Sequence, residues 1–316
     1  MPKLPRRLNL GDTLGLILPA SAPADPASID QAIALFEKLG FKIVLGKHGR
    51  ERNGFLAGDD RSRASDVMSM FKNRKIQGIV CFRGGYGTPR ILPMLDYEVI
   101  RENPKVFIGF SDITALHCAF LKKSNLVSFH GPNGASLSEE NVPEFTLSSW
   151  LKSLKQPAAY GSISQGCPDA DIQIVRKGKA VGGLVGGNLA LVSSLVGTAY
   201  LPSFKDKILF LEDVGEAPYR MDRMLTQLLN AGLMEGVKGV AIGRCHNCSD
   251  NRTNPSGEYR QTVDDVFVER FGGLKIPMVM GLPFGHVSLN ATLPVGVKAE
   301  LDATKGDLII LEPAVS

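Results

Sequence analysis

Short apolar runs alternate with longer amphipathic segments along the first half of the chain. Continuous apolar runs predict buried strands, and apolar residues at helical spacing predict helices. The expected strands are 14–18, 41–45, 76–82 and 105–110, and the expected helices are 27–39, 61–71 and 113–122. Short strands separated by helices are typical of a parallel sheet covered on both faces. Ligands gather at the carboxyl ends of such strands, so the loops after Phe82 and Phe110 deserve inspection for chemistry.

The periodic pattern stops in the middle of the chain and then resumes in a more mixed form. Residues 157–171 are rich in Pro, Gly, Ser and Asp, which is typical of a linker or long loop. Beyond it we expect strands at 208–211, 237–242 and 277–282, helices at 221–231 and 262–271, and an antiparallel pair at 295–301 and 308–311. We therefore predict an α/β protein of two domains, 1–156 and 176–316, joined by the linker 157–175.

Composition and charge exclude several classes of protein. The chain has 316 residues, 44% hydrophobic and 22% charged, which are ordinary values for a globular protein. Its net charge of +4 is too small to indicate a nucleic-acid partner, and no run of five like charges occurs. No apolar stretch approaches the ~20 residues of a membrane span. We expect neither nucleic acid nor a membrane as a partner.

The N-terminus imitates a secretory signal, because basic residues up to Arg7 precede the apolar segment 14–20. Gly11 and Asp12 interrupt the pattern and Pro19 ends it, so a first strand followed by a turn explains it better. Five cysteines are an odd number and give no even disulfide framework. The sequence therefore predicts a protein of the reducing cytoplasm.

A serine lies where the strand 105–110 meets the next helix. The order of strand, Ser111 and a helix beginning near Asp112 is the context of a nucleophile elbow, although the motif is Gly-x-Ser-Asp. Such a bend exposes the hydroxyl, and the free amides of the helix N-terminus can stabilise an oxyanion. The motif alone favours the simpler alternative, in which Ser111 or Asp112 caps the helix.

A serine nucleophile needs a base and an acid that orients it. Of the five histidines, His130 and His286 each follow a short strand, and the residues alone do not choose between them or exclude a structural role. Glu212 ends the apolar run 209–211 and is a candidate acid. Its alternative role is a salt bridge with Arg220 or Arg223.

Two further motifs are candidates for binding a ligand or a metal. The loop from Arg83 to Gly87 contains glycines that let main-chain amides approach a ligand, so it is an anion or oxyanion loop or a simple turn. It lacks dinucleotide-binding spacing, and no Walker sequence occurs. Cys245 and Cys248 have the spacing of a metal or redox pair, but no second pair exists. We interpret them as incidental thiols and predict no metal and no cofactor.

Nine short motifs, taken together and in order, resemble one family. They are Gly11-Asp12, Leu56 to Asp59 with Arg63, Cys81 to Gly87, Gly109 to Leu116, Phe129 to Pro132, Gly186 to Asn188, Leu211 to Asp213, Tyr219 to Arg223 and Gly285-His286. The chain thus resembles the serine LD-carboxypeptidases of the muramoyl-tetrapeptide carboxypeptidase family, which includes the microcin C self-immunity peptidases. Two departures are minor: Phe110 stands where tyrosine is frequent, and Phe82 where a smaller residue is frequent.

The resemblance implies both a fold and a set of site residues. It implies a flavodoxin-like N-terminal domain with a parallel sheet, a smaller swivelling β/α C-terminal domain and a homodimer. Ser111 would be the nucleophile, Glu212 the orienting acid and His286 the base. The main-chain amides of Asp112 and Gly85 would form the oxyanion hole.

The resemblance also implies an activity. The enzyme would remove the terminal D-alanine from murein tetrapeptides, whose third residue is diaminopimelate or lysine, during peptidoglycan recycling. Arg83 and Arg223 are the candidates to bind the terminal carboxylate. Two alternatives stay open: a self-immunity peptidase that cleaves aminoacyl-nucleotide amides, and a non-catalytic binding protein with a two-lobed cleft. The single tryptophan, Trp150, makes a base-stacking loop less favoured.

Overall fold

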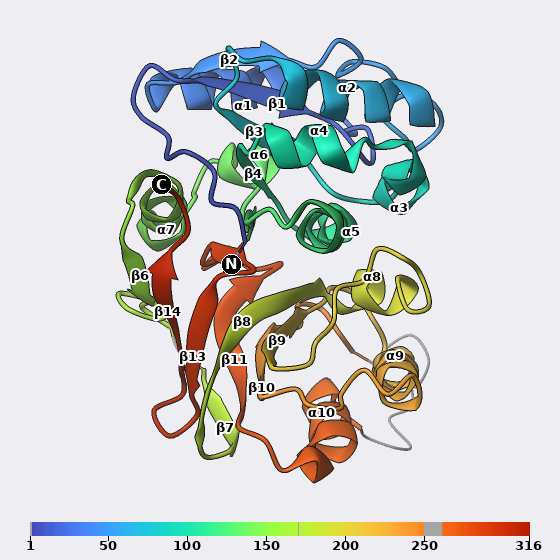
Figure 1. Ribbon diagram of the computed structural model, residues 1–316, viewed down its shortest axis with the longest axis vertical. Coiled ribbons are helices and arrows are strands. Elements are labelled where there is room, and N and C mark those ends of the chain that lie inside the picture. The colour runs from blue at the N-terminus through green and yellow to red at the C-terminus, as the bar shows by residue number, and fades with distance from the viewer. Residues whose placement is uncertain (1, 170, 250–260) are drawn as a thin grey trace.

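The protein folds into two α/β layers, one above the other in the view of Figure 1. The structure is a computed structural model, and it describes residues 2–169, 171–249 and 261–316. One layer is built on a six-stranded sheet and the other on an eight-stranded sheet. The predicted α/β class with two domains is confirmed. Among the described residues, no helix has the length and hydrophobicity needed to cross a membrane.

The first sheet has the strand order β12-β5-β4-β3-β1-β2. Five strands are parallel, and β12 pairs antiparallel with β5. Their bounds are β1 (Thr13–Ile17), β2 (Lys42–Leu45), β3 (Gly78–Cys81), β4 (Val106–Gly109), β5 (Ser128–His130) and β12 (Leu293–Val295). The helices of this layer are α1 (Ala27–Lys38), α2 (Asp60–Lys72), α3 (Thr88–Ile91), α4 (Tyr97–Glu102), α5 (Thr114–Ala119), α6 (Gly134–Leu137) and α7 (Glu144–Lys155).

Successive residues of these strands enter two different apolar clusters. Ile79 of β3 and Phe107 of β4 pack with α2 and α5, whereas Val80 and Ile108 pack with α1 and α7. Both faces of the sheet are therefore buried, which explains why its strands are continuous apolar runs instead of alternating ones. The parallel pairing of β3 and β4 places their carboxyl ends at one edge of the sheet.

The second sheet has the order β6-β14-β13-β8-β9-β10-β11-β7. Its central strands β8 to β11 are parallel, and the outer strands are antiparallel. The bounds are β6 (Ala159–Ser162), β7 (Gln173–Arg176), β8 (Lys179–Asn188), β9 (Lys207–Glu212), β10 (Gly239–Arg244), β11 (Met278–Gly285), β13 (Lys298–Asp302) and β14 (Asp307–Pro313). Its helices are α8 (Leu189–Ser194), α9 (Pro218–Asn230) and α10 (Val263–Phe271), which lie together on one side of the sheet in Figure 1.

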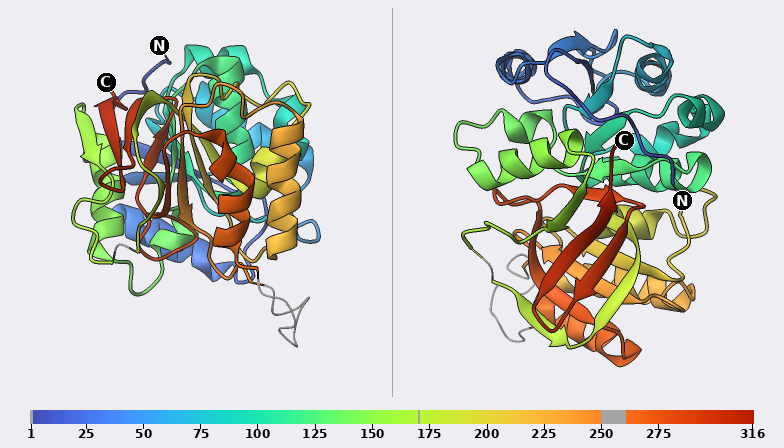
Figure 2. Two further views of the ribbon diagram at one scale, coloured as in Figure 1. Left: turned by 90° about the horizontal axis from the view of Figure 1, so that it is seen from below. Right: turned by 60° about the vertical axis from the view of Figure 1, so that its left-hand side comes forward.

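The chain crosses between the two layers more than once. The predicted linker 157–175 contains β6 and most of β7, and both are edge strands of the second sheet. After β11 the chain returns to the first sheet as β12 before it forms β13. The ends of the chain also meet, because the Arg7 N–H donates to Ser316 O at 3.0 Å, and Figure 2 shows both termini on one side of the molecule. The predicted domain boundaries stay a prediction.

Trp150 fixes α7 on the first sheet. Its ring is fully buried and stacks on Phe36 of α1, with ring centroids 5.8 Å apart. We expect Trp150→Ala to lower the free energy of unfolding by about 3–5 kcal/mol, because it leaves a large cavity between α1 and α7. Urea denaturation followed by circular dichroism measures this loss. Leu10→Ala is the control, since Leu10 is 69% exposed, and it should change stability by less than about 0.5 kcal/mol.

Candidate active site

Ser111 occupies a sharp bend between β4 and α5. The strand ends at Gly109, Phe110 is extended, and Ser111 has a left-handed φ of 65° before a 3-10 turn leads into the helix. A non-glycine residue in this region is held there against a local preference by its surroundings. Neither Ser111 nor Asp112 caps the helix with its side chain. The strand–turn–helix arrangement predicted around Ser111 is therefore present, without the predicted alternative of a helix cap.

The glycine loop packs directly against this bend. A Cβ atom at Gly84 would lie 2.8 Å from Ser111 Cβ and 3.1 Å from the Asp112 nitrogen, so a larger residue would push the loop away. Buried Arg63 holds the loop by donating from Nη1 to the carbonyls of Pro19 and Gly87. Burial is the main reason that the pKa of this guanidinium is lowered.

Asp112 ties the bend to the other end of the loop. Its Oδ2 accepts from the Thr88 N–H at 2.8 Å, and its main-chain oxygen accepts from the Thr88 hydroxyl. Burial raises the pKa of the Asp112 carboxyl. The N–H groups of Ile113 and Thr114 donate to nearby carbonyls, whereas the Asp112 N–H has no hydrogen-bond partner within the described residues and can meet a ligand. Gly85, the second predicted oxyanion residue, has φ +107° and lies against Ser21.

Glu212 and His286 come together from the second sheet. Glu212 is the last residue of β9 and has no exposed surface, and His286 follows the end of β11. Glu212 Oε2 lies 2.6 Å from His286 Nδ1. Gly285 permits this approach, because a Cβ there would lie 3.0 Å from Glu212 Oε2. A carboxylate thus fixes one imidazole nitrogen and leaves Nε2 for chemistry.

The electrostatics of this pair stabilise the protonated imidazole. Burial by itself lowers the pKa of His286, but the hydrogen bond that Nδ1 donates to Glu212, together with the charges of Glu212 and Asp213, outweighs burial and raises the pKa above 6.5. Among the described residues Glu212 forms no salt bridge with Arg220 or Arg223: Arg220 pairs with Glu216 at 3.7 Å, and the Arg223 guanidinium lies over the Tyr219 ring. Glu212 has His286 as its closest charged partner.

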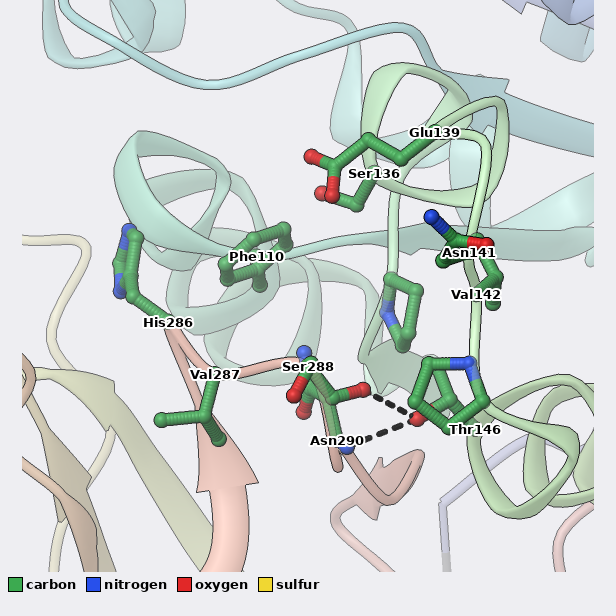
Figure 3. A pocket seen from close by; sticks show the side chains of 12 residues that line it. Phe110, Ser136, Glu139, Asn141, Val142, Thr146, His286, Val287, Ser288 and Asn290 are labelled. Atoms are coloured by element: carbon green, nitrogen blue, oxygen red, sulfur yellow. Dashed lines mark hydrogen bonds between the residues drawn. The ribbon is translucent and has the colours of Figure 1, made fainter.

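Ser111 and His286 line the same cavity, of about 390 Å³, together with Arg83, Gly84 and Gly85. The His286 ring also lies beside the bend, with its centroid 4.7 Å from that of Phe110, as Figure 3 shows. Within the described residues no hydrogen bond joins the Ser111 hydroxyl to His286. The cavity therefore collects groups from both sheets without a preformed serine–histidine hydrogen bond.

His130 lies beneath this cavity and does not line it. The ring is fully buried, 5.3 Å from the Phe210 ring centroid, and Nε2 is 3.9 Å from Glu212 Oε1. Neither ring nitrogen has a hydrogen-bond partner in the described part of the chain. Burial, with the charges of His117 and His286, holds the pKa of His130 well below 6.5. The geometry favours His286 over His130 as a base.

The two candidate arginines have different positions. Arg83 lines the cavity and donates from Nη1 to Ala22 O at 3.2 Å. Arg223 is an exposed residue of α9 with its guanidinium 5.5 Å from the Tyr219 ring centroid, and it does not line this cavity. The structure therefore separates Arg223 from the other predicted site residues, because its helix packs beside α8 and α10.

Cys245 and Cys248 line a separate cavity of about 300 Å³ near Arg244 and Gly281. Both are free thiols. A hydrogen bond from Cys245 is the main reason that the pKa of Cys248 is lowered. In the parts of the chain that the structure describes, no group of three or more His, Cys, Asp and Glu residues is arranged to hold a metal ion.

Three residues at the site were given no role on the basis of the sequence. Thr88 holds Asp112, Asp213 anchors the end of β8, and Glu139 lines the cavity beside Ser136. An acid next to a buried strand is a signal for Asp213. Glu139 lies in a loop and Thr88 begins the short helix α3, and neither position has a pattern that sets it apart, so only the fold identifies them.

Both halves of the chain match one protein family. Residues 14–131 match the LD-carboxypeptidase N-terminal domain, and residues 181–301 match the LD-carboxypeptidase C-terminal domain. The chain is also 36% identical over 307 residues to the probable murein peptide carboxypeptidase of Bacillus subtilis (strain 168), covering 97% of this chain and 93% of that protein. The chain belongs to the LD-carboxypeptidase family.

Two solved structures share the fold across almost the whole chain. The microcin C7 self-immunity protein MccF superposes with a TM-score of 0.88 at 27% identity, covering 100% of both chains. The muramoyltetrapeptide carboxypeptidase from Oxalobacter formigenes superposes with a TM-score of 0.82 at 29% identity, covering 95% of this chain and 99% of that one. The fold is thus common to a protein named for self-immunity and to one named for the cleavage of a muramoyltetrapeptide.

The Glu212–His286 pair gives a testable titration. In the unaltered protein we expect a His286 pKa above 6.5. Glu212→Gln removes the negative charge, so burial should then dominate and the pKa should fall below 6.5. NMR titration of the imidazole signals measures the shift. His130 is the internal control, because it should stay neutral throughout; an unchanged His286 pKa in the variant would contradict the assigned electrostatics.

Proposed function

We propose that this protein is a serine LD-carboxypeptidase that removes the terminal D-alanine from murein tetrapeptides. The observation that carries the proposal is the hydrogen bond between buried Glu212 and His286. His286 lines the same cavity as Ser111, whose backbone is strained. Family membership supports the class of reaction. The bond cleaved joins the carbonyl of an L-configured diamino-acid centre to the nitrogen of D-alanine.

The proposed reaction uses an acyl-enzyme. His286 Nε2 accepts the Ser111 proton as the Ser111 oxygen attacks the carbonyl carbon, and the resulting imidazolium is stabilised by Glu212. The imidazolium then gives its proton to the departing D-alanine amine. A water molecule, activated by the same imidazole, hydrolyses the Ser111 ester and regenerates the serine. We expect substrate binding to bring the Ser111 hydroxyl and His286 Nε2, which line the same cavity, into hydrogen-bonding geometry.

Main-chain amides are the proposed stabilisers of the oxyanion. The free Asp112 N–H lies at the positive end of a helical segment, and the Gly84–Gly85 peptide packs against the bend. Fixed donors of this kind act on charge that develops in the transition state, which is why they raise kcat more than substrate affinity. The family resemblance implies Gly85 as the second donor, and the close packing of Gly84 on Ser111 supports this loop in that role.

Arg83 is the proposed ligand of the terminal carboxylate of the substrate. It is the cation, besides His286, among the residues that line the Ser111 cavity. A carboxypeptidase must recognise a free terminal carboxylate next to the bond it cleaves, and a guanidinium is suited to this by its paired donors. Arg223 does not line this cavity, so we do not propose it for this role.

A second candidate function is a self-immunity peptidase that cleaves aminoacyl-nucleotide amides. The TM-score of 0.88 to MccF favours it, and one MccF structure holds aspartyl sulfamoyl adenosine. Stacking of a nucleobase needs an accessible aromatic ring. Trp150 has no exposed surface and packs between α7 and α1, so it is not available for this purpose. We prefer the murein-peptide function because the chain is 36% identical to a relative named as a probable murein peptide carboxypeptidase and 28% identical to MccF.

The proposal includes a cellular setting. All five cysteines are free thiols, which fits the reducing cytoplasm, where murein peptides are recycled. By its resemblance to the family, the protein is expected to act as a homodimer, which light scattering of the purified chain tests.

The deciding experiment measures D-alanine release from L,D-tetrapeptides that contain diaminopimelate or lysine, beside hydrolysis of an acyl-sulfamoyl adenosine. Release of D-alanine with little nucleotide cleavage supports the proposal. The opposite preference supports the self-immunity function. Binding of the tetrapeptide without hydrolysis would support a non-catalytic binding protein.

Ser111→Ala tests the nucleophile. We expect D-alanine release to fall by several orders of magnitude while the circular dichroism spectrum and the melting temperature stay close to those of the unaltered protein. The loss follows because the ester of the proposed mechanism forms on the Ser111 oxygen, which alanine lacks. A folded variant with substantial activity would contradict the serine mechanism.

A double-mutant cycle tests whether Ser111 and His286 act as one unit. Because the base has no function without the nucleophile, adding His286→Ala to Ser111→Ala should cost little more than Ser111→Ala alone. His130→Phe is the matched control: it keeps an aromatic ring among Phe110 and Phe210 and should retain measurable turnover. An inactive but folded His130→Phe, together with an active His286→Ala, would assign the base to His130 instead.

A further inference from the structure

A second cavity of about 250 Å³ adjoins the one that contains Ser111. The two cavities share Phe110, Ser136, Glu139 and His286 in their linings. The second extends from these residues toward Thr146 and Asn290, and Figure 3 shows its walls. A substrate whose carbonyl lies at Ser111 therefore has room on both sides of His286.

The linings of the two cavities differ in charge. The Ser111 cavity contains Asp25, Arg83 and Glu139 besides His286. Among the described residues that line the second cavity, Glu139 is the charged side chain other than His286, and no lysine or arginine is present. The second cavity is thus acidic, whereas the cation Arg83 belongs only to the first.

Glu139 also differs from the other charged groups in having no partner. Arg83 donates to Ala22 O at 3.2 Å, and Asp25 Oδ1 accepts from the Ala27 N–H at 2.9 Å. Within the described residues the Glu139 carboxylate makes no hydrogen bond and no ion pair. Figure 3 shows it turned toward the Ser136 side chain at the edge of the cavity. A carboxylate so placed attracts a cation that enters the cavity.

The main chain at Glu139 is held in place by the short helix that precedes it. Asn133 Oδ1 accepts from the Ser136 N–H at 3.0 Å and caps α6. The Ser138 N–H closes the helix on Gly134 O at 3.2 Å. The backbone of this wall is therefore ordered by hydrogen bonds while the Glu139 carboxylate itself stays available, as expected of a group that meets a ligand.

We propose that Glu139 determines specificity by binding the side-chain ammonium of the residue whose carbonyl Ser111 attacks. The inference rests on the proposed function and deepens it: the substrates are L,D-peptides with a cationic side chain at that residue, such as lysine or the amino group of diaminopimelate. Opposite charges then recognise the two sides of the scissile bond, Arg83 the terminal carboxylate and Glu139 the ammonium. An acidic side chain at the same residue is repelled.

The test compares kcat/KM for a series of L,D-tetrapeptides that differ only at the third residue. Lysine carries the ammonium, Nε-acetyl-lysine and norleucine lack the charge, and glutamate reverses it. We expect the unaltered protein to prefer lysine over norleucine by about tenfold, the effect of one charge-assisted contact in a partly hydrated cleft. The preference should shrink as salt is raised, because the contact is reached by solvent.

Variants at Glu139 should change this ratio. Glu139→Gln should bring the lysine-to-norleucine ratio close to one, chiefly through KM for the lysyl peptide, and Glu139→Lys should favour the glutamyl peptide. Glu140→Gln is the matched control, since Glu140 is the neighbouring exposed acid and lines neither cavity. It should keep the full preference. A preference for lysine that survives Glu139→Gln overturns the inference and leaves the proposed function intact.

A binding measurement separates the two possible failures. Calorimetry on Ser111→Ala should give tighter binding of the lysyl than of the norleucyl peptide, and this difference should disappear when Glu139→Gln is added. If no peptide is hydrolysed but the binding difference is present, the proposed function fails and the role of Glu139 as an ammonium ligand stands. If neither variant distinguishes the peptides, Glu139 has no such role.

Discussion

One contact between the two sheets brings the halves of the site together. The Asn188 N–H donates to Thr114 Oγ1 at 3.0 Å, which ties the end of β8 to the first turn of α5, three residues after Ser111. A Cβ at Gly187 would lie 2.5 Å from Thr114, so this approach requires a residue without a side chain. In the parallel register of β8 and β9, Asn188 is the partner of Glu212. The position of the bend relative to the acid therefore depends on this junction.

The adjacent acids Glu212 and Asp213 are buried by different means. Asp213 accepts three N–H donors, from the Asn188 side chain and from the main chain of Ala190 and Val214, at 2.8–2.9 Å. Burial and the neighbouring Glu212 charge nevertheless raise the pKa of Asp213 to about 6. Glu212 instead has the His286 imidazole at 2.6 Å. Asp213 therefore stabilises the junction, whereas Glu212 orients the imidazole. Two neighbouring carboxylates of similar burial thus have separate roles.

The sequence contains most of the fold in its local patterns and much less of the site. Buried parallel strands such as Val106–Gly109 are apolar throughout, which makes them visible without any tertiary information. The edge strands β6 and β7 are partly or largely exposed and lack that pattern, and β12 is defined by a partner more than 160 residues away, His130, which is paired with Leu293. The choice between His130 and His286 was open for the same reason. It depends on which ring reaches Glu212 and which is enclosed by phenylalanines, and both are long-range facts. The proposed role of Glu139 depends on the cavities that it lines, and no local sequence pattern indicates that position.

The return of the chain to the first sheet has a consequence for how the base is held. His286 lies on the segment 286–292, which is anchored at one end by β11 in the second sheet and at the other by β12 in the first. The middle of this segment is fastened to α7, where Thr146 Oγ1 donates to Ser288 O at 2.6 Å and accepts from the Asn290 N–H at 2.9 Å, the dashed lines of Figure 3. Any rotation of one layer against the other would change the tension in the segment 286–292 and so displace the imidazole. The orientation of the layers and the alignment of the base are thus mechanically coupled through seven residues of chain.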